Sequence, residues 1–457
     1  MAILESKRNQ TRAGALFEFT QGIEVDARLA KQEVRVQIAW ARALAGLKIL
    51  TQEEFKQVES TLSEALTLME AGKFQWRVED EDIHMNLERF VTERAGILGK
   101  KMHVGRSRND LIATTLRLFA RDTVEELSAE VKDLILALCE RAEKDADVIV
   151  PGLTHLQHGQ PIRHGHTLAG HGWAFSRDLK RLRAAQNEAM GVMPQGSAAL
   201  SGTTLPVDLN IVARELGFGS PPVNSYDSVG DRDFILEALN ALAISAVHLS
   251  RLAEDCVIWS STAVGLVRLP SAWSTGSSIM PNKRNPDVPE LVRAKAAHII
   301  AASTNAQTLM KGVPTSYGSD LHELKSVFMR AVDEFAACLS VLPEFVRGLE
   351  PNRVRARELL KKGHILATEI ADQLTAQGVP FREAYAQVAA LVETAENQGV
   401  QLEDLSESDW SPIVPGLSAK FMPELTPEYA VERRTNCGGS SMARTLEGIL
   451  ALRKILG

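Results

Sequence analysis

The sequence has few of the features that mark membrane, secreted or nucleic-acid-binding proteins. No run of about 18 apolar residues is long enough to span a bilayer, and the opening MAILESKRNQ lacks the apolar core of a signal peptide. No block of Lys and Arg is long enough to follow a phosphate backbone, since 51 basic and 58 acidic residues are interspersed and the net charge is -7. We therefore expect a soluble cytoplasmic protein with neither nucleic acid nor a membrane as partner.

Cysteine is scarce and never occurs as a CxxC pair. Cys139, Cys256 and Cys338 fall inside helical apolar patterns, where cysteine behaves as a small hydrophobic residue, and Cys437 stands apart from them. Histidines cluster between residues 155 and 171, but no cysteine or carboxylate completes a set of metal ligands there. The sequence predicts neither a disulfide nor a metal site.

Aromatic residues make up only 5% of the chain, and alternating Val, Ile, Thr and Tyr runs between turn residues are nearly absent, so strands are not expected. Residues 106–150 contain no Gly and no Pro, and apolar residues recur there in steps of three or four. This predicts one helix of about 40 residues. Similar runs cover residues 231–264, 290–311 and 322–342. The expected fold class is all-α.

Glycine and proline divide the chain near residues 99–105 and 343–351. We expect an N-terminal helical domain over 1–105, a central long-helix bundle over 106–350, and a small C-terminal helical domain over 351–457. The last should contain short helices over 366–374 and 384–395. Long helices with one apolar stripe cannot bury that stripe in a thin bundle, so we expect the central domain to associate with copies of itself.

Two candidate segments flank the longest predicted helix. HVGRSRND, residues 103–110, combines Arg106 and Arg108 with a natural N-cap at Asn109 or Asp110, which suits a carboxylate or phosphate. It could equally be a capped helix with solvated arginines. PGLTHLQHGQP, residues 151–161, places His155 in a Pro- and Gly-bounded turn, where it is either a general acid or base or a structural hydrogen-bonding residue.

Two further segments precede later helices. NSYDSVGDRDF, residues 224–234, is explained mostly by helix capping and a local ion-pair network. TGSSIMPNKRNPDVPE, residues 275–290, is more specific, because it joins hydroxyls, the Lys283 ammonium and the Asn285 carboxamide in one loop before a helix capped by Asp287. Those groups can remove a proton and stabilise the resulting oxyanion. A phosphate loop, a GxSxG elbow and a dinucleotide fingerprint are all absent.

Taken in order, these segments resemble the argininosuccinate lyase family, within the superfamily that also contains fumarase, aspartase, adenylosuccinate lyase and the δ-crystallins. The resemblance extends over about nine-tenths of the chain and includes EDEDIH, GKKMHVGRSRND, THLQ, MPQGSAALSGT, NSYDSVGDRD, STGSSIMPNKRNPD, LMKGVPTSY and GVPFREA. The GSSxMPxKxN loop is typical of the superfamily, whereas GRSRND and Asn-Ser-x-Asp indicate the argininosuccinate lyase branch.

The resemblance implies a cofactor-free, reversible elimination of fumarate from N-(L-arginino)succinate that gives L-arginine, the last step of arginine biosynthesis. By similarity, Ser277 is the base, and Lys283 and Asn285 bind the carboxylate on which the carbanion charge accumulates. His155 is implied to be the general acid for the leaving nitrogen, with Glu290 of another subunit as its charge partner.

The same resemblance implies how substrate is held. Thr154, Arg108 and Asn109 would bind the succinyl carboxylates. Tyr317 and Lys325 would hold the distal half of the substrate, with His322 beside them. Each site of the family is assembled from three subunits of a homotetramer built on twenty long helices, which would cover the apolar stripes described above.

The sequence departs from the family pattern mainly around the amine half of the substrate. Gly22 stands where the family uses a serine, His322 replaces a glutamine, Leu324 replaces an acidic residue, and RAGALFEFTQ from Arg12 replaces WGGRF. A lyase for another N-succinyl amine, such as a diamine disuccinate, therefore stays open. So does a crystallin-like structural role, although such a role would not need His155, Ser277 and Lys283.

Overall fold

The computed structural model describes residues 18–457 and forms two compact units, each built from several stretches of the chain. The first unit takes in residues up to Ser128, Lys180–Ile244 and Ala297–Phe335, and the second takes in Ala129–Leu179, Ser245–Ala296 and Ala336–Gly457. Helices dominate both, which confirms the all-α prediction. The prediction of three consecutive domains stays a prediction. Residues 12–17 of the segment that replaces WGGRF lie outside the described part.

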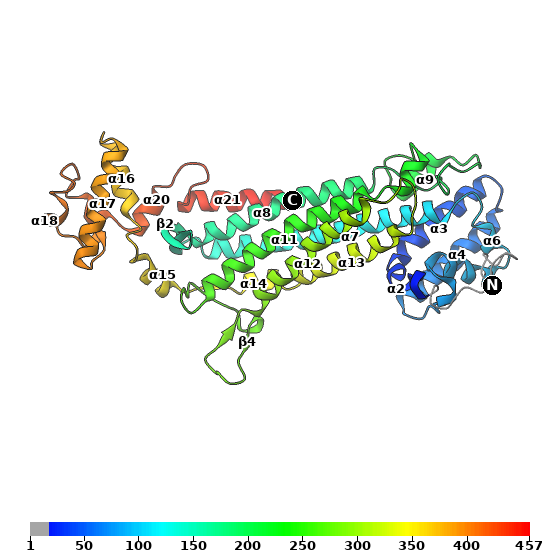
Figure 1. Cartoon of the computed structure of the whole chain (residues 1–457), viewed down its shortest axis with the longest axis horizontal. Helices are drawn as coiled ribbons and strands as arrows, with labels where there is room; N and C mark the ends of the chain where they lie inside the picture. Colours follow the sequence, from blue (N-terminus) through cyan, green and yellow to red (C-terminus); the bar gives the residue numbers. More distant parts are fainter. Residues whose placement is uncertain (1–17) are drawn as a thin grey trace. The chain divides into compact units, whose positions relative to one another are not determined.

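Each of five long helices begins in residues of one unit and ends in residues of the other. They are α7 (Arg108–Lys144), α8 (His164–Ala189), α11 (Asp233–Ser260), α12 (Asp287–Met310) and α13 (Asp320–Leu339) (Figure 1). Four of them match the predicted runs to within a few residues. The sequence did not indicate α8, because glycines interrupt its pattern. A Cβ at Gly165 would meet the Ala142 carbonyl oxygen at 2.3 Å, so this glycine lets α8 pack closely against α7.

In the first unit, short helices pack around a core of their own. They are α2 (Ile23–Asp26), α3 (Ala30–Gly46), α4 (Gln52–Glu70), α5 (Ile83–Ala95), α6 (Leu98–Lys101), α9 (Leu209–Leu216) and α10 (Ser225–Gly230). Trp40, Leu44 and Leu62 are fully buried in this core. Thr51 and Glu54 form a reciprocal capping box that fixes the start of α4.

Small helices of the second unit share a C-terminal core (Figure 1). They are α15 (Arg353–Leu360), α16 (Ala367–Ala376), α17 (Phe381–Gln398), α18 (Glu407–Trp410), α19 (Phe421–Glu424) and α20 (Pro427–Glu432), while α14 (Leu342–Arg347) and α21 (Met442–Leu456) lie beside the long helices. The two helices predicted over 366–374 and 384–395 are confirmed as α16 and α17. Short 3-10 turns occur at Ala27–Leu29, Val78–Asp80, Ser271–Trp273 and Leu402–Asp404.

Strands are few but were not expected at all. Three antiparallel pairs are formed by β1 (Ile149–Thr154) with β2 (Gln157–Arg163), β3 (Val267–Arg268) with β6 (Glu350–Pro351), and β4 (Thr275–Gly276) with β5 (Arg284–Asn285). The segment expected to be a turn after α7 is therefore a full hairpin. Its strands contain Pro151, Gly152, Gly159 and Pro161, which hide the alternating pattern that normally predicts a strand.

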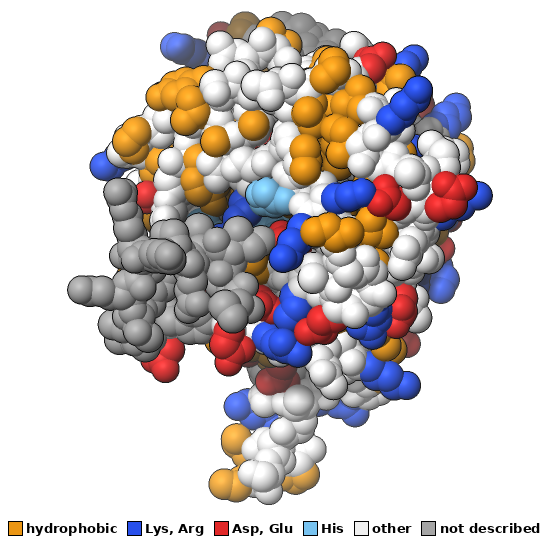
Figure 2. Space-filling model, turned by 90° about the vertical axis from the view of Figure 1, so that its right-hand side faces the viewer, with side chains coloured by type: hydrophobic (Ala, Val, Ile, Leu, Met, Phe, Trp, Pro, Cys, Tyr) orange, Lys and Arg blue, Asp and Glu red, His pale blue; other side chains and the backbone are white. Residues whose placement is uncertain are grey.

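Among the described residues, one helix is long and apolar enough to cross a membrane by length and composition alone. This is α11, and half of its most apolar 18-residue window is buried inside the protein, as in core helices. On the face shown in Figure 2, basic and acidic side chains are interspersed among the described residues.

Candidate functional site

A polar cavity in the first unit collects the residues predicted to hold the distal half of a substrate. Its volume is about 370 Å³, and we call it the Tyr317 pocket. It is lined by Thr20, Gly22, Asp26, Glu81, Asp82, Arg108, Asn109, Ile112, Tyr317, Ser319 and His322. Residues from α2, the loop before α5, the start of α7 and the start of α13 with its preceding loop thus meet at one place. Lys325 is buried and forms an ion pair with Asp26 of this lining.

Tyr317 and His322 form a hydrogen-bonded pair in this pocket. The Tyr317 hydroxyl lies 2.6 Å from His322 Nε2, and the two rings meet edge to face. Burial, with the Lys325 ammonium nearby, lowers the pKa of His322 to about 4. Burial raises the pKa of the Tyr317 hydroxyl. Both side chains are therefore neutral near pH 7 and act through hydrogen bonds.

Arg108 is bound to carboxylates rather than solvated. Its Nε donates to Asp82 Oδ2 at 3.0 Å, and its other donors reach Asp82 and Glu81. Burial alone would raise the pKa of Asp82, but His84 and Arg108 bring it below its ordinary value. The pocket wall therefore carries a fixed set of opposite charges.

The start of α7 differs from the expected cap. Ser107 is the capping residue: its Oγ accepts from the Asn109 amide at 3.3 Å, and its own amide donates to Asp110 Oδ1 at 3.0 Å. Asp110 also accepts from the Gly196 and Ala198 amides at 2.9 Å. Neither Asn109 nor Asp110 is the N-cap, because the helix already begins at Arg108. Burial raises the pKa of Asp110 to about 6.

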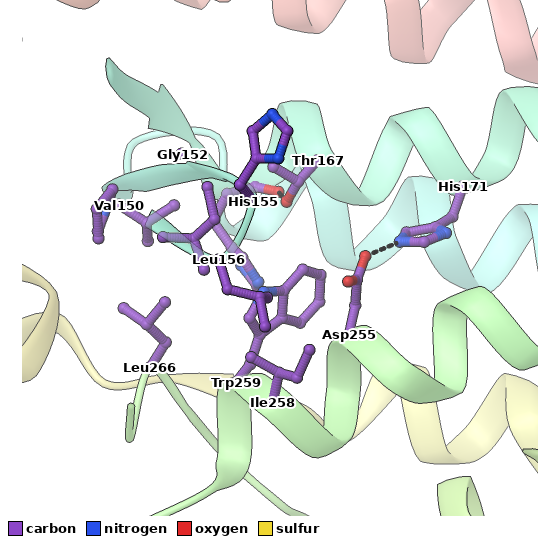
Figure 3. Close-up of a pocket in the computed structure, with 13 residues that line it drawn as sticks. Val150, Gly152, His155, Leu156, Thr167, His171, Asp255, Ile258, Trp259 and Leu266 are labelled. Atoms are coloured by element: carbon purple, nitrogen blue, oxygen red, sulfur yellow. Dashed lines mark hydrogen bonds and ion pairs between the residues drawn. The ribbon is translucent and has the colours of Figure 1, made fainter. Parts of the chain in front are cut away.

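In the second unit, the β1–β2 hairpin presents His155 on a strained two-residue turn. His155 and Leu156 have φ of 55° and 57°, the left-handed region that non-glycine residues seldom adopt, and Thr154 pairs with Gln157 across the turn. His155 is exposed and lies at the edge of a cavity beneath the turn (Figure 3). Thr154 lines a different cavity, on the side of Thr368 and Arg434. Strain of this kind is often concentrated at functional positions.

The β4–β5 hairpin carries Ser277, Lys283 and Asn285 and extends away from the helices of its unit (Figure 1). Ser277 Oγ accepts from the Ile279 amide at 3.2 Å and from the Met280 amide at 3.0 Å. Lys283 is exposed, while Ser277 and Asn285 are half-buried.

The Asp287 carboxylate closes the base of the β4–β5 hairpin. It accepts from both the amide and the hydroxyl of Thr275, at 3.1 and 2.6 Å. The Thr275 hydroxyl hydrogen bond lowers the pKa of Asp287. Asp287 is therefore the first residue of α12 and ties the loop to the helix, instead of acting only as the expected N-cap. Glu290 lies in the first turn of α12 and is exposed.

The segment over 224–234 fits the capping interpretation. Asn224 accepts from the Tyr226 and Asp227 amides and begins α10. The ion pair is not local, however, because Asp231 binds the buried Arg117 of α7 instead of Arg232. Arg232 is fully buried and donates to the carbonyl oxygens of Val229 and Asp231.

The predicted site residues thus fall into three groups. Arg108, Asn109, Tyr317 and His322 line the Tyr317 pocket, and the buried Lys325 pairs with Asp26 of its lining. Thr154 and His155 occupy the β1–β2 turn, and Ser277, Lys283, Asn285 and Glu290 belong to the β4–β5 hairpin and the helix after it. The Tyr317 pocket contains no residue of the other two groups.

Sequence reasoning missed several charged residues of the pocket region. Asp26 and Asp82 were not singled out, although Asp82 ends the EDED run. Behind them, the buried His84 contacts Glu33 at 2.6 Å. Burial would lower the pKa of His84, but Glu33 and Asp82 raise it above its ordinary value. The one signal in the sequence for this buried network is the run of acidic residues just before His84.

All four cysteines lie in the part of the chain that the structure describes, none of them forms a disulfide there, and the three expected inside helices are buried in α7, α11 and α13. Within residues 18–457 no group of three or more His, Cys, Asp or Glu side chains is arranged to hold a metal ion.

Known proteins match the chain over nearly its whole length. A family model described as lyase matches residues 7–301, and one described as argininosuccinate lyase C-terminal matches residues 364–432. Argininosuccinate lyase of Nitratidesulfovibrio vulgaris strain Hildenborough is 40% identical, covering 98% of this chain and 97% of the relative. The Hahella chejuensis enzyme is 38% identical, with 96% and 93% covered.

Solved structures agree on the fold. A variant of EDDS lyase with bound fumarate superimposes with a TM-score of 0.84 at 24% identity, covering 98% of this chain and 91% of the other. A class II fumarase from Schistosoma mansoni gives a TM-score of 0.74 at 17% identity, with 88% and 90% covered. The helices, loops and matches together define a lyase of the fumarase and aspartase superfamily. Within that superfamily, the chain belongs to the argininosuccinate lyase family.

Proposed function

We propose that this protein catalyses the reversible elimination of fumarate from N-(L-arginino)succinate to give L-arginine. Relatives at 38–41% identity that cover nearly the whole chain carry this activity in their names. The structural observation that supports it best is the Ser277 hydroxyl, which accepts two backbone amides in an exposed loop that also carries Lys283.

In this proposal Ser277 is the base. Two amide donors directed at one oxygen stabilise its negative form, which is what a hydroxyl needs in order to take a proton from carbon. Lys283 and Asn285 bind the carboxylate next to that carbon, where charge accumulates before the C–N bond breaks. The base takes the proton, the electron pair forms the fumarate double bond, and the leaving nitrogen receives a proton.

His155 is the proposed donor of that last proton, with Glu290 as its charge partner. The left-handed turn holds the imidazole exposed at the tip of a hairpin, where a substrate can reach it. Thr154, Arg108 and Asn109 are proposed to bind the succinyl carboxylates. Arg108 already contacts two carboxylates, so a substrate would share the guanidinium with Asp82.

The Tyr317 pocket is proposed to take the amino-acid end of the arginine half. Asp26, Glu81 and Asp82 can receive its ammonium, while Lys325 and the Tyr317–His322 pair can donate to its carboxylate. Gly22 lines this pocket where the family has a serine, so one side-chain contact is lost, and His322 occupies the position of a glutamine.

Assembly and location are part of the proposal. Three groups of site residues that lie on separate segments suit a homotetramer in which each active site takes one group from each of three subunits. The surface helices leave Ile244, Val247 and Ile300 exposed, and these could pack against other subunits. We propose a cytoplasmic homotetramer; the oligomeric state can be measured by light scattering.

The direct test is fumarate release from argininosuccinate, followed by ultraviolet absorbance, with arginine quantified in parallel. We expect kcat/KM of at least about 10⁴ M⁻¹s⁻¹, and rescue of an arginine auxotroph that lacks its own lyase. Faster cleavage of a diamine disuccinate or an N-succinyl amino acid, with no rescue, would leave only the lyase class. No turnover of any N-succinyl compound would favour a structural role.

A further inference from the structure

A second cavity lies beneath the β1–β2 turn, and His155 is the one residue of its lining that has a role in the proposed reaction. Its volume is about 370 Å³, and His155 and Leu156 form part of its wall. Figure 3 shows Ile258, Trp259 and Asp255 of α11 facing the turn, with His171 of α8 at the side. Apolar side chains make up much of the lining, and none of the lining residues is a lysine or an arginine.

His164, another residue of this lining, is held as a hydrogen-bond acceptor. Its Nδ1 lies 2.9 Å from Asp145 Oδ2, and Asp145 is also bound by Arg141. In the neutral form of this imidazole, Nδ1 donates its proton to Asp145 and the lone pair is on Nε2. His164 is 2% exposed, and Nε2 has no partner among the described residues. A buried acceptor without a partner is costly unless a ligand or water donates to it.

Asp255 supplies a second acceptor and a negative charge. Its Oδ2 lies 2.9 Å from His171 Nε2, and its side chain is 43% exposed. A carboxylate accepts several hydrogen bonds, so this contact leaves further acceptor capacity. The cavity thus offers a buried nitrogen acceptor, a carboxylate and an apolar wall that includes Trp259.

We propose that this cavity binds a small organic cation with N–H donors, an alkylguanidinium or alkylammonium. The cationic head would donate to His164 Nε2 and to Asp255, and the alkyl chain would pack against Ile258 and Trp259. A cavity of this size suits such a ligand. An anion is disfavoured, because the two acceptors would repel it and the lining has no lysine or arginine to compensate.

The occupant would also contact the turn that carries His155. If the proposed function is correct, the amine released by the reaction belongs to this class of cation, and binding here would disturb the proposed acid. Binding itself does not depend on that function, so direct binding and effects on turnover are measured separately.

The binding test uses full-length protein labelled with 5-fluorotryptophan, with the Trp259 fluorine signal assigned by Trp259→Phe. Ethylguanidinium and ethylammonium are titrated up to about 20 mM, with acetate and neutral N-ethylurea as matched probes. We expect a saturable shift of the Trp259 signal with both cations and none with the other two. Equal binding of N-ethylurea, or no saturable shift with the cations, refutes the proposal.

Variants locate the site. Asp255→Asn removes the charge and should weaken cation binding at least about tenfold, the ordinary value of a charged hydrogen bond. Ile258→Phe keeps both acceptors but fills the cavity and should abolish the shift. Glu254→Gln changes the neighbouring carboxylate, which binds Arg293 and does not line the cavity, and should leave affinity within about twofold. Unchanged binding in both Asp255→Asn and Ile258→Phe would place the cation elsewhere and overturn the proposal.

In wild-type enzyme, ethylguanidinium should inhibit fumarate release noncompetitively, and Ile258→Phe should be resistant. Inhibition that is competitive and persists in Ile258→Phe would assign the effect to the active site. If the protein binds the cation but never releases fumarate, the proposed cation site is supported and the proposed function is refuted.

Discussion

The Tyr317–His322 pair allows a prediction that separates substrate binding from chemistry. We expect His322→Phe to raise KM and leave kcat within about threefold of wild type. The pocket is proposed to hold a part of the substrate that is unchanged in the reaction, so its contacts are equally strong in the ground and transition states.

The magnitude follows from the hydrogen bond that this pair, joined at 2.6 Å, is proposed to donate to the substrate carboxylate. A hydrogen bond to a charged group contributes about 1.5–3 kcal/mol. KM should therefore rise by about 10- to 150-fold. His322→Gln restores a donor and acceptor and serves as the control, with KM within about threefold of wild type. Steady-state kinetics of fumarate release would measure both values.

The pH dependence gives an independent check. Because the folded pKa of His322 is about 4, below its ordinary 6.5, the unfolded chain binds this proton more tightly. The residue therefore lowers stability as pH falls from about 6.5 toward 4, and His322→Gln should lose less stability over that range. KM of the wild type should show no inflection due to His322 between pH 6 and 8. Two results would refute this reasoning. One is a fall in kcat of more than about 100-fold in His322→Phe with KM unchanged. The other is an inflection of KM near pH 6.5 that His322→Gln removes.

Three further outcomes are expected. Ser277→Ala should lower kcat at least about 10³-fold while equilibrium binding of substrate changes little, since the base acts in the transition state; normal turnover would exclude Ser277 as the base. His155→Asn should cost about 10²- to 10⁴-fold in kcat, as measured by fumarate release, and a smaller loss would exclude a positioned acid. Lys325→Met leaves Asp26 buried without its partner and should lower the free energy of unfolding by about 3–5 kcal/mol. Adding Asp26→Asn should recover part of that loss. An unchanged melting temperature in Lys325→Met would show that the pair is not needed for stability.

Periodicity was enough to predict the long helices, because an apolar stripe in steps of three or four must face a core. It failed for α8, where close packing against α7 requires Gly165 and tertiary contact overrides the low helix propensity of glycine. It failed again for the β1–β2 hairpin, whose register depends on a turn with φ above 50° at His155 and Leu156. Neither residue is a usual choice for such a turn, so no sequence signal marks it.

Individual site residues were easier to predict than their surroundings. Ser277, Lys283 and Asn285 share one loop, so proximity in sequence already placed them together. The Tyr317 pocket instead joins residues separated by almost 300 positions, such as Asp26 and Lys325, and only the fold can bring them into contact. The neutral state of His322 likewise depends on burial, which its sequence neighbours do not reveal.

Shared active sites make a quantitative prediction for mixed subunits. Neither Ser277→Ala nor His155→Asn should be active alone. Suppose that each site takes Ser277 from one subunit and His155 from another. The site is then intact when the subunit that supplies Ser277 is the His155→Asn variant and the subunit that supplies His155 is the Ser277→Ala variant. In tetramers dissociated and reassembled from equal amounts of both variants, about one site in four meets this condition, so about 25% of wild-type activity should return. Each variant put through the same treatment by itself is the control and should stay inactive. Ser277 and His155 lie in the same unit of one chain, so the alternative is that a single subunit supplies both to one site. In that case no mixture of the two variants regains activity, whatever the proportions. That result would show that the shared-site arrangement is wrong.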